Sequence, residues 1–157
     1  MSRLAFLSPD ESAADVPRVS PLRHALSPAF TDVSGIGKLE VRGDVSRLDG
    51  AISIGPRRAL LVIDGDVRET RDRLTAEGYR VYDMSGALAA FEVEGEDLMR
   101  RLTELDLDAL PAIGSIARGT TALIERRDGE RFRLFVPQEL GQFVAEVVND
   151  MHAGLRR

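Results

Sequence analysis

Short stretches in which hydrophobic and polar residues alternate recur along this chain, and they predict strands with one buried face. Glycine, proline, aspartate and serine separate these stretches, as expected for turns. Residues 59–63 are apolar throughout, so we expect this strand to be buried on both faces. Asp128 and Gly129 predict a tight hairpin turn between the last two strands. The predicted strands are residues 38–42, 51–54, 59–63, 79–84, 88–94, 120–126 and 131–136.

Three helices are predicted from capping residues and from apolar residues at helical spacing. Asp66, with Glu69 three residues later, marks the start of the first helix, and Gly78 marks its end. The second helix covers residues 96–104. The third begins near Pro137 and carries the apolar residues Leu140, Phe143, Val144, Val147, Val148 and Met151. This order of elements predicts an α+β fold, with a layer of mostly antiparallel strands and helices on one side, because the short turns permit hairpins.

The chain also contains an internal repeat, in which an Asp-x-Ser-Gly turn leads into a strand that ends in Glu-Val-x-Gly and an acid. The first turn begins at Asp32 and the second at Asp83, 51 residues later, while the Glu-Val-x-Gly parts lie 52 residues apart. A repeat of this period predicts two related units, residues 31–78 and 79–153, in a single domain that spans 31–157. Chance is the alternative, because Asp and Ser start turns and Gly ends strands in many proteins.

Residues 1–30 mix serine, proline and acidic residues without a clear period, and they predict an extended N-terminal arm. A short helical turn is expected around residues 22–26. An arm with so little apolar surface either stays mobile or lies against another surface. Its expected docking residues are Phe6, Leu7, Val19, Leu22 and Leu26.

Composition narrows the classes of function. The net charge of −5 argues against nucleic-acid binding, and the absence of cysteine excludes disulfides, thiolate nucleophiles and thiolate metal sites. Lys38 is the only lysine, and most arginines have acids nearby in the sequence, which indicates solvated faces of mixed charge. The apolar run at residues 4–7 is too short for a signal peptide, and no stretch approaches the roughly 20 apolar residues of a membrane span. We therefore expect a cytoplasmic protein.

Catalytic chemistry is sparse. His24 and His152 are the only histidines, and neither has a partner at metal-ligand spacing. A Ser-His-Asp arrangement can be drawn from Ser34, His24 and Asp32, but nothing in the sequence orients these side chains. We therefore predict no catalytic residue and no metal site.

Two further patterns have a structural and a functional interpretation. Asp106 and Asp108 alternate with leucines, so they either project together into a groove or cap the following turn. Gly35 and Gly37 form Gly-x-Gly, but they precede a strand, whereas a dinucleotide-binding turn leads into a helix. A nucleotide site is therefore not expected.

The repeated turn-and-strand pattern resembles the start of the folate-binding domain shared by the glycine-cleavage aminomethyltransferase (T-protein) and its relatives. A series of short motifs resembles the sarcosine oxidase gamma subunit more closely and covers about residues 20–150. One departure is visible, because Ala59 stands where that family has a tryptophan. The motifs are Ser20-Pro21-Leu22, Ile54-Gly55-Pro56, Leu60-Leu61-Val62, Val81-Tyr82-Asp83-Met84-Ser85, Leu105-Asp106-Leu107 and Phe132-Arg133-Leu134-Phe135-Val136-Pro137.

The resemblance implies a fold of two related, intertwined β-rich subdomains with flanking helices. It also implies a small non-catalytic subunit of a sarcosine oxidase, beside larger alpha-type and beta-type subunits that carry flavin, NAD and folate. In the folate-processing relatives a carboxylate lies where the pterin binds, and the resemblance assigns that position to Asp106 or Asp108.

Two hypotheses of different classes follow. In the first, the chain is an accessory subunit whose N-terminal arm and exposed apolar residues dock against larger partners. In the second, it is a stand-alone tetrahydrofolate-binding protein or a degenerate aminomethyltransferase-like enzyme, with a pocket between its two units.

Overall fold

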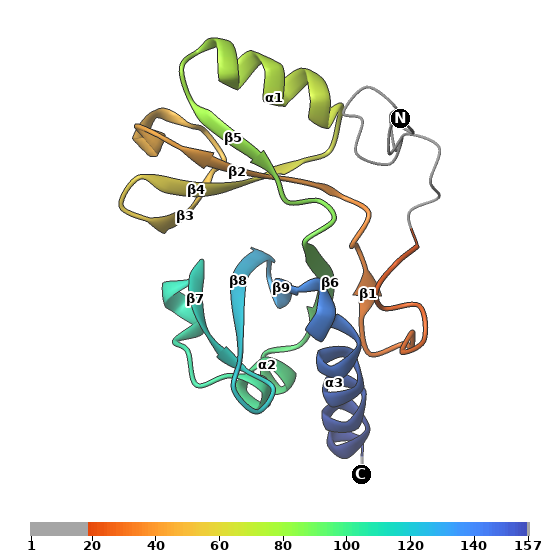
Figure 1. Ribbon diagram of the computed structural model, residues 1–157. Coiled ribbons are helices and arrows are strands. Elements are labelled where there is room, and N and C mark those ends of the chain that lie inside the picture. Colours follow the sequence, from red (N-terminus) through yellow and green to blue (C-terminus); the bar gives the residue numbers. More distant parts are fainter. Residues whose placement is uncertain (1–18, 157) are drawn as a thin grey trace, which may run out of the picture.

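The computed structural model describes residues 19–156, and it consists of two antiparallel β-sheets packed against each other with helices on their outer faces (Figure 1). The five-stranded sheet has the order β1 (Thr31–Asp32), β6 (Leu88–Glu94), β9 (Arg131–Pro137), β8 (Thr120–Asp128), β7 (Ala112–Ile116). The four-stranded sheet has the order β3 (Ile52–Gly55), β4 (Arg58–Ile63), β2 (Gly37–Arg42), β5 (Arg80–Asp83). The α+β fold class predicted from the sequence is thereby confirmed.

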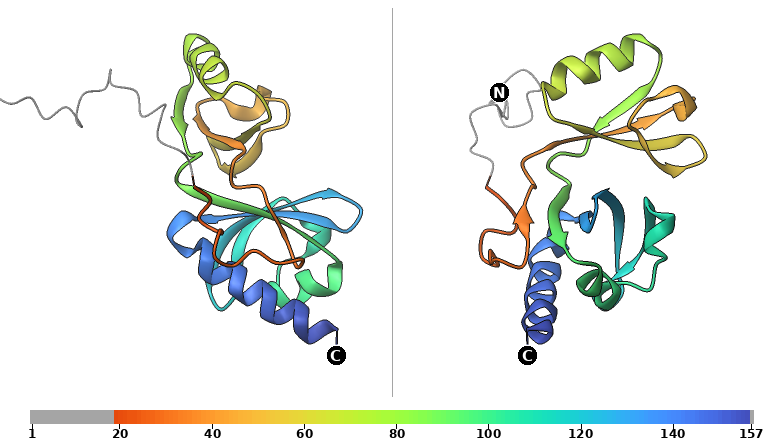
Figure 2. Two further views of the ribbon diagram at one scale, coloured as in Figure 1. Left: turned by 90° about the vertical axis from the view of Figure 1, so that its right-hand side faces the viewer. Right: turned by 180° about the vertical axis from the view of Figure 1, so that it is seen from behind.

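In the described residues, three α-helices flank the two sheets. Helix α1 (Val67–Ala76) covers the outer face of the four-stranded sheet, while α2 (Glu96–Leu102) and α3 (Gly141–Leu155) lie on the outer face of the five-stranded sheet (Figures 1 and 2). The expectation of one layer with helices on one side was therefore wrong. Alternation in a strand shows that a face is buried, but it does not show whether a helix or a second sheet covers that face.

Strand β4 is packed on both faces, as its continuous apolar sequence predicted. Leu60 and Val62 pack in the cluster between the two sheets, whereas Leu61 and Ile63 pack in the cluster beneath α1. The same alternation in β2 directs Leu39 toward α1.

Helix α1 has the caps that the sequence predicted. The side chain of Asp66 accepts hydrogen bonds from the backbone N–H groups of Arg68 and Glu69. At the other end, Gly78 has a φ of +93°, and the next N–H, of Tyr79, donates to the carbonyl of Leu74 at 3.1 Å. This arrangement is a Schellman motif, and it turns the chain directly into β5.

The chain crosses between the sheets at the two repeated turns. Strand β1 pairs with β6, but the chain then turns and continues as β2 in the other sheet. Strand β5 pairs with β2, and the chain turns again and continues as β6. Strand β1, which precedes β2 in the chain, therefore belongs to the five-stranded sheet. Strand β5, which precedes β6, belongs to the four-stranded sheet.

Several elements differ from the sequence prediction. Strands β1 and β7 were not predicted, because β1 has two residues and β7 is interrupted by Gly114. Helix α2 ends at Leu102 rather than at residue 104. Helix α3 begins at Gly141 after the short 3-10 helix η5 (Gln138–Leu140), and Leu140 and Phe143 are 37% and 40% exposed instead of buried.

The described part of the N-terminal arm packs along α3. Leu22 is fully buried in the core of the five-stranded sheet, and residues 22–25 form a hydrogen-bonded turn. Asn149 of α3 donates to the carbonyl of Ala25 at 2.9 Å. Val19 and Leu26 are exposed, so of the predicted docking residues in this part only Leu22 packs. Phe6 and Leu7 lie outside the described residues.

Candidate functional site

The two Asp-x-Ser-Gly turns have the same local structure. The carboxylate of Asp32 accepts from the N–H of Ser34 at 2.9 Å, and that of Asp83 accepts from the N–H of Ser85 at 2.9 Å. These are Asx turns, in which a short acidic side chain replaces a backbone acceptor. Both aspartates therefore close turns.

Each turn is fastened to the long strand that follows the other turn. Ser34 exchanges two hydrogen bonds of 3.1 Å with the backbone of Ala90 in β6. Ser85 accepts from the N–H of Lys38 in β2 at 3.0 Å, and the N–H of Met84 donates to the Lys38 carbonyl at 2.8 Å. The two copies of the repeat therefore make equivalent contacts, because each turn bonds the strand that follows the other turn.

A cavity of about 430 Å³ lies beside the crossovers and brings both turns together. Its wall combines the two turns with the described start of the chain, the first residue of β6 and the start of η5. The lining residues are Val19, Ser20, Pro21, Ser34, Gly35, Ser85, Gly86, Leu88 and Gln138.

Lys38 follows the first of the two turns in the chain and is completely buried. Its ammonium group donates to the carbonyls of Ser34 at 2.8 Å and of Ile36 at 3.0 Å. A buried ammonium needs such acceptors, because burial without them is costly. The single lysine of the chain thus holds the first crossover together.

The Ser-His-Asp arrangement considered from the sequence is not formed. Ser34 is engaged with the backbone of Ala90, and Asp32 is hydrogen-bonded to Ser20 and to the N–H of Ser34. His24 is exposed and, within residues 19–156, makes no hydrogen bond to either side chain.

Asp106 and Asp108 lie at the 3-10 helix η4 (Leu107–Ala109) after α2. Asp106 accepts from the N–H of Asp108 at 3.0 Å and so caps η4. The side chain of Asp108 is 90% exposed and lies 3.8 Å from Arg126. The structure therefore shows the capping role for Asp106. Contact of either residue with a pterin stays a prediction.

The Gly-x-Gly pattern has a packing role. A Cβ atom on Gly37 would lie 2.3 Å from Cγ2 of Val67, the first residue of α1. Gly37 therefore allows α1 to approach the start of β2 closely. A Cβ on Gly35 would meet no atom within 4 Å.

The inner face of the five-stranded sheet carries a buried ionic network that was missed in the sequence. Arg133 donates to Glu92 at 2.7 and 2.9 Å and to Glu125 at 3.2 Å. Burial raises the pKa of the Glu125 carboxyl, and Arg127 and Arg133 partly offset this effect. The sequence signal that could have revealed this network is a glutamate or an arginine inside a strand that is otherwise apolar.

A related ionic group lies on the inner face of the four-stranded sheet. Glu40 accepts from Arg42 at 2.5 Å and from Arg58 at 2.9 Å. The pKa of Glu40 lies below its ordinary value, mainly because Arg58 donates a hydrogen bond to the carboxylate. Glu40 and Glu92 occupy the same position in the Glu-Val-x-Gly part of the repeat, so both halves place an acid–arginine group on the face between the sheets.

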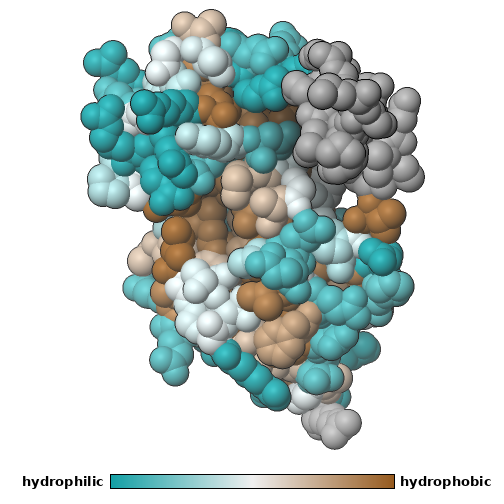
Figure 3. Space-filling view, in the orientation of Figure 1, coloured by the Kyte–Doolittle hydropathy of each residue, from teal (hydrophilic) through white to brown (hydrophobic). Residues whose placement is uncertain are grey.

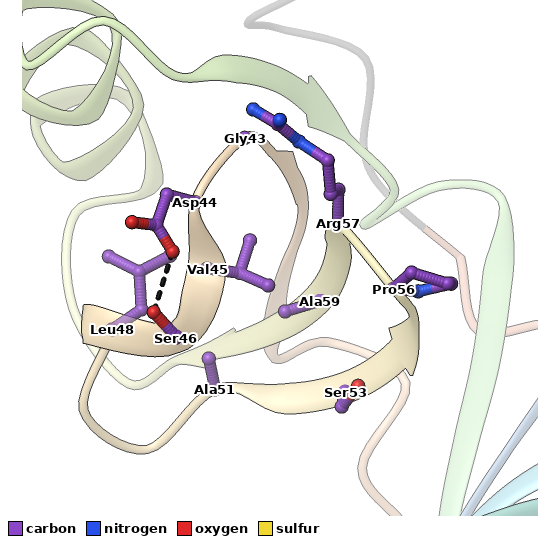
Figure 4. A pocket seen from close by; sticks show the side chains of 10 residues that line it. All are labelled: Gly43, Asp44, Val45, Ser46, Leu48, Ala51, Ser53, Pro56, Arg57 and Ala59. Carbon is purple, nitrogen blue, oxygen red and sulfur yellow. Dashed lines mark hydrogen bonds between the residues drawn. The ribbon is translucent and has the colours of Figure 1, made fainter.

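A larger hollow of about 680 Å³ lies at the end of the four-stranded sheet that α1 leaves uncovered (Figure 4). Its centre is apolar and includes Val45 and the buried Ala59, while Asp44 and Arg57 lie on different sides of the rim (Figure 4). A hollow with an apolar floor and a charged rim suits a side chain or a small ligand that has an apolar part and a charged part.

The described part of the chain contains neither a cluster of metal ligands nor a helix suited to crossing a membrane. In residues 19–156 no group of three or more histidine, aspartate or glutamate side chains is placed to hold a metal ion. Over the same residues, no helix combines the length and the apolar character needed to cross a membrane.

Comparison with known proteins defines the class of fold. No family model matches the chain, and no curated protein matches it by sequence. The structure matches that of a sarcosine oxidase chain, so the fold is related to sarcosine oxidase.

The matched chain belongs to "Heterotetrameric Sarcosine Oxidase from Corynebacterium sp. U-96 in complex with pyrrole 2-carboxylate". The TM-score is 0.71 at 16% sequence identity, and the match covers 89% of this chain and 97% of that chain. The two chains therefore differ little in length. At this identity the likeness establishes the fold alone.

Proposed function

We propose that this chain is a non-catalytic, gamma-type accessory subunit of a heteromeric, flavin-dependent complex of the sarcosine oxidase type. Such a complex oxidatively demethylates sarcosine or a related N-methyl amino acid, with folate as the acceptor of the one-carbon unit. The flavin and NAD belong to the larger alpha-type and beta-type subunits.

The single observation that carries this proposal is the fold match over nearly the full length of both chains. A match confined to a shared domain would leave much of one chain uncovered. Here the matched chain is almost entirely covered, and the solved protein is itself a heterotetramer. A small chain of this shape therefore has a precedent as one subunit among several.

Exposed apolar side chains supply candidate contacts with larger partners. Leu26, Ile113 and Phe143 are exposed by 60%, 48% and 40%. In Figure 3 apolar residues gather in a hollow between the two halves of the molecule. Aromatic and aliphatic anchors of this kind supply much of the energy at stable interfaces.

Affinity purification from the native host tests the proposal. A tagged chain should bring down two larger proteins, and the eluate should show the absorbance of flavin. Phe143→Asp should weaken this association if α3 contributes to the interface. Ala153→Asp is the matched control, because it adds the same charge at an exposed position of the same helix.

The stand-alone hypothesis predicts a different result. A chain that purifies alone and binds tetrahydrofolate in a calorimetric titration would overturn the subunit proposal. In that case Asp106→Asn and Asp108→Asn identify which carboxylate contacts the pterin. A chain that co-purifies with flavoproteins and does not bind tetrahydrofolate by itself supports the subunit proposal.

A further inference from the structure

Three arginines lie side by side on the inner face of the four-stranded sheet, one on each of the neighbouring strands β4, β2 and β5 (Figure 1). Arg42 of β2 is the register partner of Arg58 in β4 and of Arg80 in β5. In antiparallel strands, directly opposite residues share a face and have Cβ atoms about 5 Å apart. The three side chains therefore form one row across the sheet, which we call the arginine row.

Glu40 brings two guanidinium groups of the arginine row together. Its Oε1 atom accepts from Nε of Arg42 at 2.5 Å and from Nε of Arg58 at 2.9 Å. Both bonds use Nε, which leaves the terminal amino groups of these arginines for other acceptors. Within residues 19–156 the side chain of Arg80 makes no ion pair or hydrogen bond. One carboxylate thus accompanies three guanidiniums, and the row has an excess of positive charge.

The arginine row is open to solvent although it lies on the inner face of the sheet. The side chains of Arg42 and Arg58 are 46% and 48% exposed, and Arg80 is exposed as well. Tyr82 lies on the same face of β5, two residues from Arg80. It is 44% exposed, and its ring centre lies 4.7 Å from Cζ of Arg42. The five-stranded sheet therefore leaves this part of the four-stranded sheet uncovered.

The composition of this surface is typical of a contact with another molecule. Like charges that lie directly opposite on neighbouring strands destabilise a sheet, so the row gains from a further anion. Arginine and tyrosine are enriched where proteins bind one another, and they supply much of the binding energy there. A positive row on a chain with a net charge of −5 also favours a negatively charged partner at this one place.

We propose that the arginine row binds an acidic segment of a partner protein, in an extended conformation, through carboxylates two residues apart. The row spans roughly 10 Å, since neighbouring strands lie about 4.8 Å apart. Side chains on one side of an extended segment recur about every 6.6 Å, so two carboxylates fall within the row. Each carboxylate accepts charge-assisted hydrogen bonds from the terminal amino groups of the arginines.

The charge of the whole chain disfavours a nucleic acid at this surface, because a nucleic-acid strand extends its negative charge over the acidic remainder of the protein. The inference specifies the chemistry of a contact, and it does not depend on the proposed subunit function.

Titration of the full chain with a synthetic peptide tests this proposal, with ¹H–¹⁵N correlation NMR at constant ionic strength. The probe is an end-blocked peptide of four Glu-Ala repeats, and the control peptide has four Gln-Ala repeats. The acidic peptide should produce saturable shifts at the amides of residues 40–42, 58–60 and 80–82, and added salt should weaken its binding. Absence of saturable shifts, or an equal response to the Gln-Ala peptide, would overturn the proposal. Equal or tighter binding of an oligothymidylate would overturn the choice of a protein partner.

Variants separate the arginine row from the charge of the whole protein. Arg80→Gln should raise the apparent Kd about threefold to fivefold, which corresponds to one exposed ion pair. The melting temperature should stay unchanged, because Arg80 makes no side-chain bond in the described part of the chain. Arg101→Gln is the matched control, since it removes the same charge from an exposed position of α2, on the outer face of the other sheet. Equal Kd values for the two variants would show that binding follows net charge alone and would refute the proposal.

Discussion

At the residue scale, two buried charged groups have clear consequences for stability. Lys38 is wholly buried, and its ammonium group bonds two backbone carbonyls at the first crossover. Glu125 is buried in the ionic network on the inner face of the other sheet. Burial makes the charged state of both groups sensitive to the loss of a partner.

Replacement of Lys38 by Met should lower the free energy of unfolding by about 1–3 kcal/mol, since the backbone carbonyls of the partly buried Ser34 and Ile36 lose their charged donor. Urea denaturation followed by circular dichroism measures the loss. Arg80→Met, at an exposed position of β5, should change the stability little. Equal effects of the two substitutions would contradict the role assigned to Lys38.

The raised pKa of Glu125 predicts a specific pH dependence. A carboxyl whose folded pKa exceeds its ordinary value of 4.5 contributes stability that is complete below that value. This contribution is lost as the pH rises through the folded pKa, because the buried carboxylate must then be charged. Glu125→Gln should therefore become progressively more stable relative to the wild type as the pH rises from about 4 to 8.

Unfolding free energies measured across that pH range test this behaviour. Glu130→Gln, in the exposed β8–β9 turn, is the control and should run parallel to the wild type. A constant difference between the Glu125 variant and the wild type at all pH values would show that Glu125 is not protonated preferentially in the folded state.

At the element scale, close approach of α1 to β2 depends on a residue without a side chain. Gly37→Ala places a Cβ within 2.3 Å of Val67 and 3.1 Å of the Ile63 carbonyl oxygen. Such overpacking should cost about 1–3 kcal/mol of unfolding free energy. Gly35→Ala is the matched control, because open space surrounds that position. Thermal denaturation of both variants distinguishes a packing glycine from a flexible one, and similar melting temperatures would refute the packing role.

The regular elements were predicted well where the burial pattern is local. Strand β6 has the predicted bounds, and α1 has the predicted caps at Asp66 and Gly78. Strand β7 escaped prediction because its middle residue, Gly114, has no side chain to continue the alternation. That glycine leaves room for Leu105, because a Cβ would lie 2.7 Å from the Leu105 side chain, a contact between segments that no local pattern records.

At the scale of the whole molecule, the two crossovers make the sheets interdependent. Residues 31–78 lack β5, which pairs with β2, and residues 79–153 lack β1, which pairs with β6. Each fragment alone should therefore remain largely unfolded, and a mixture of the two should recover structure. Dispersion of amide signals in NMR spectra measures this, and a well-dispersed spectrum from either fragment alone would contradict the prediction.

The candidate functional regions were less predictable than the fold. The resemblance assigned a pterin contact to Asp106 or Asp108, and that contact stays a prediction. The structure adds that Asp106 caps η4 and that the side chain of Asp108 is exposed. The buried ionic network joins Arg133 of β9 to Glu92 of β6 and Glu125 of β8. These three residues form no sequence motif, and only the pairing of β9 with both other strands brings them together.

The sequence by itself determined most of the elements and the repeat, because periodic burial, capping and turn formation depend on residues close in the chain. It also indicated that Asp32 and Asp83 start equivalent turns. Only the tertiary structure decided that these turns carry the chain between two sheets, and that Ser34 and Ser85 fasten each turn to a strand more than 45 residues away. Local patterns indicate which face of a strand is buried. Which sheet or helix covers that face depends on how apolar surfaces from distant segments pack together.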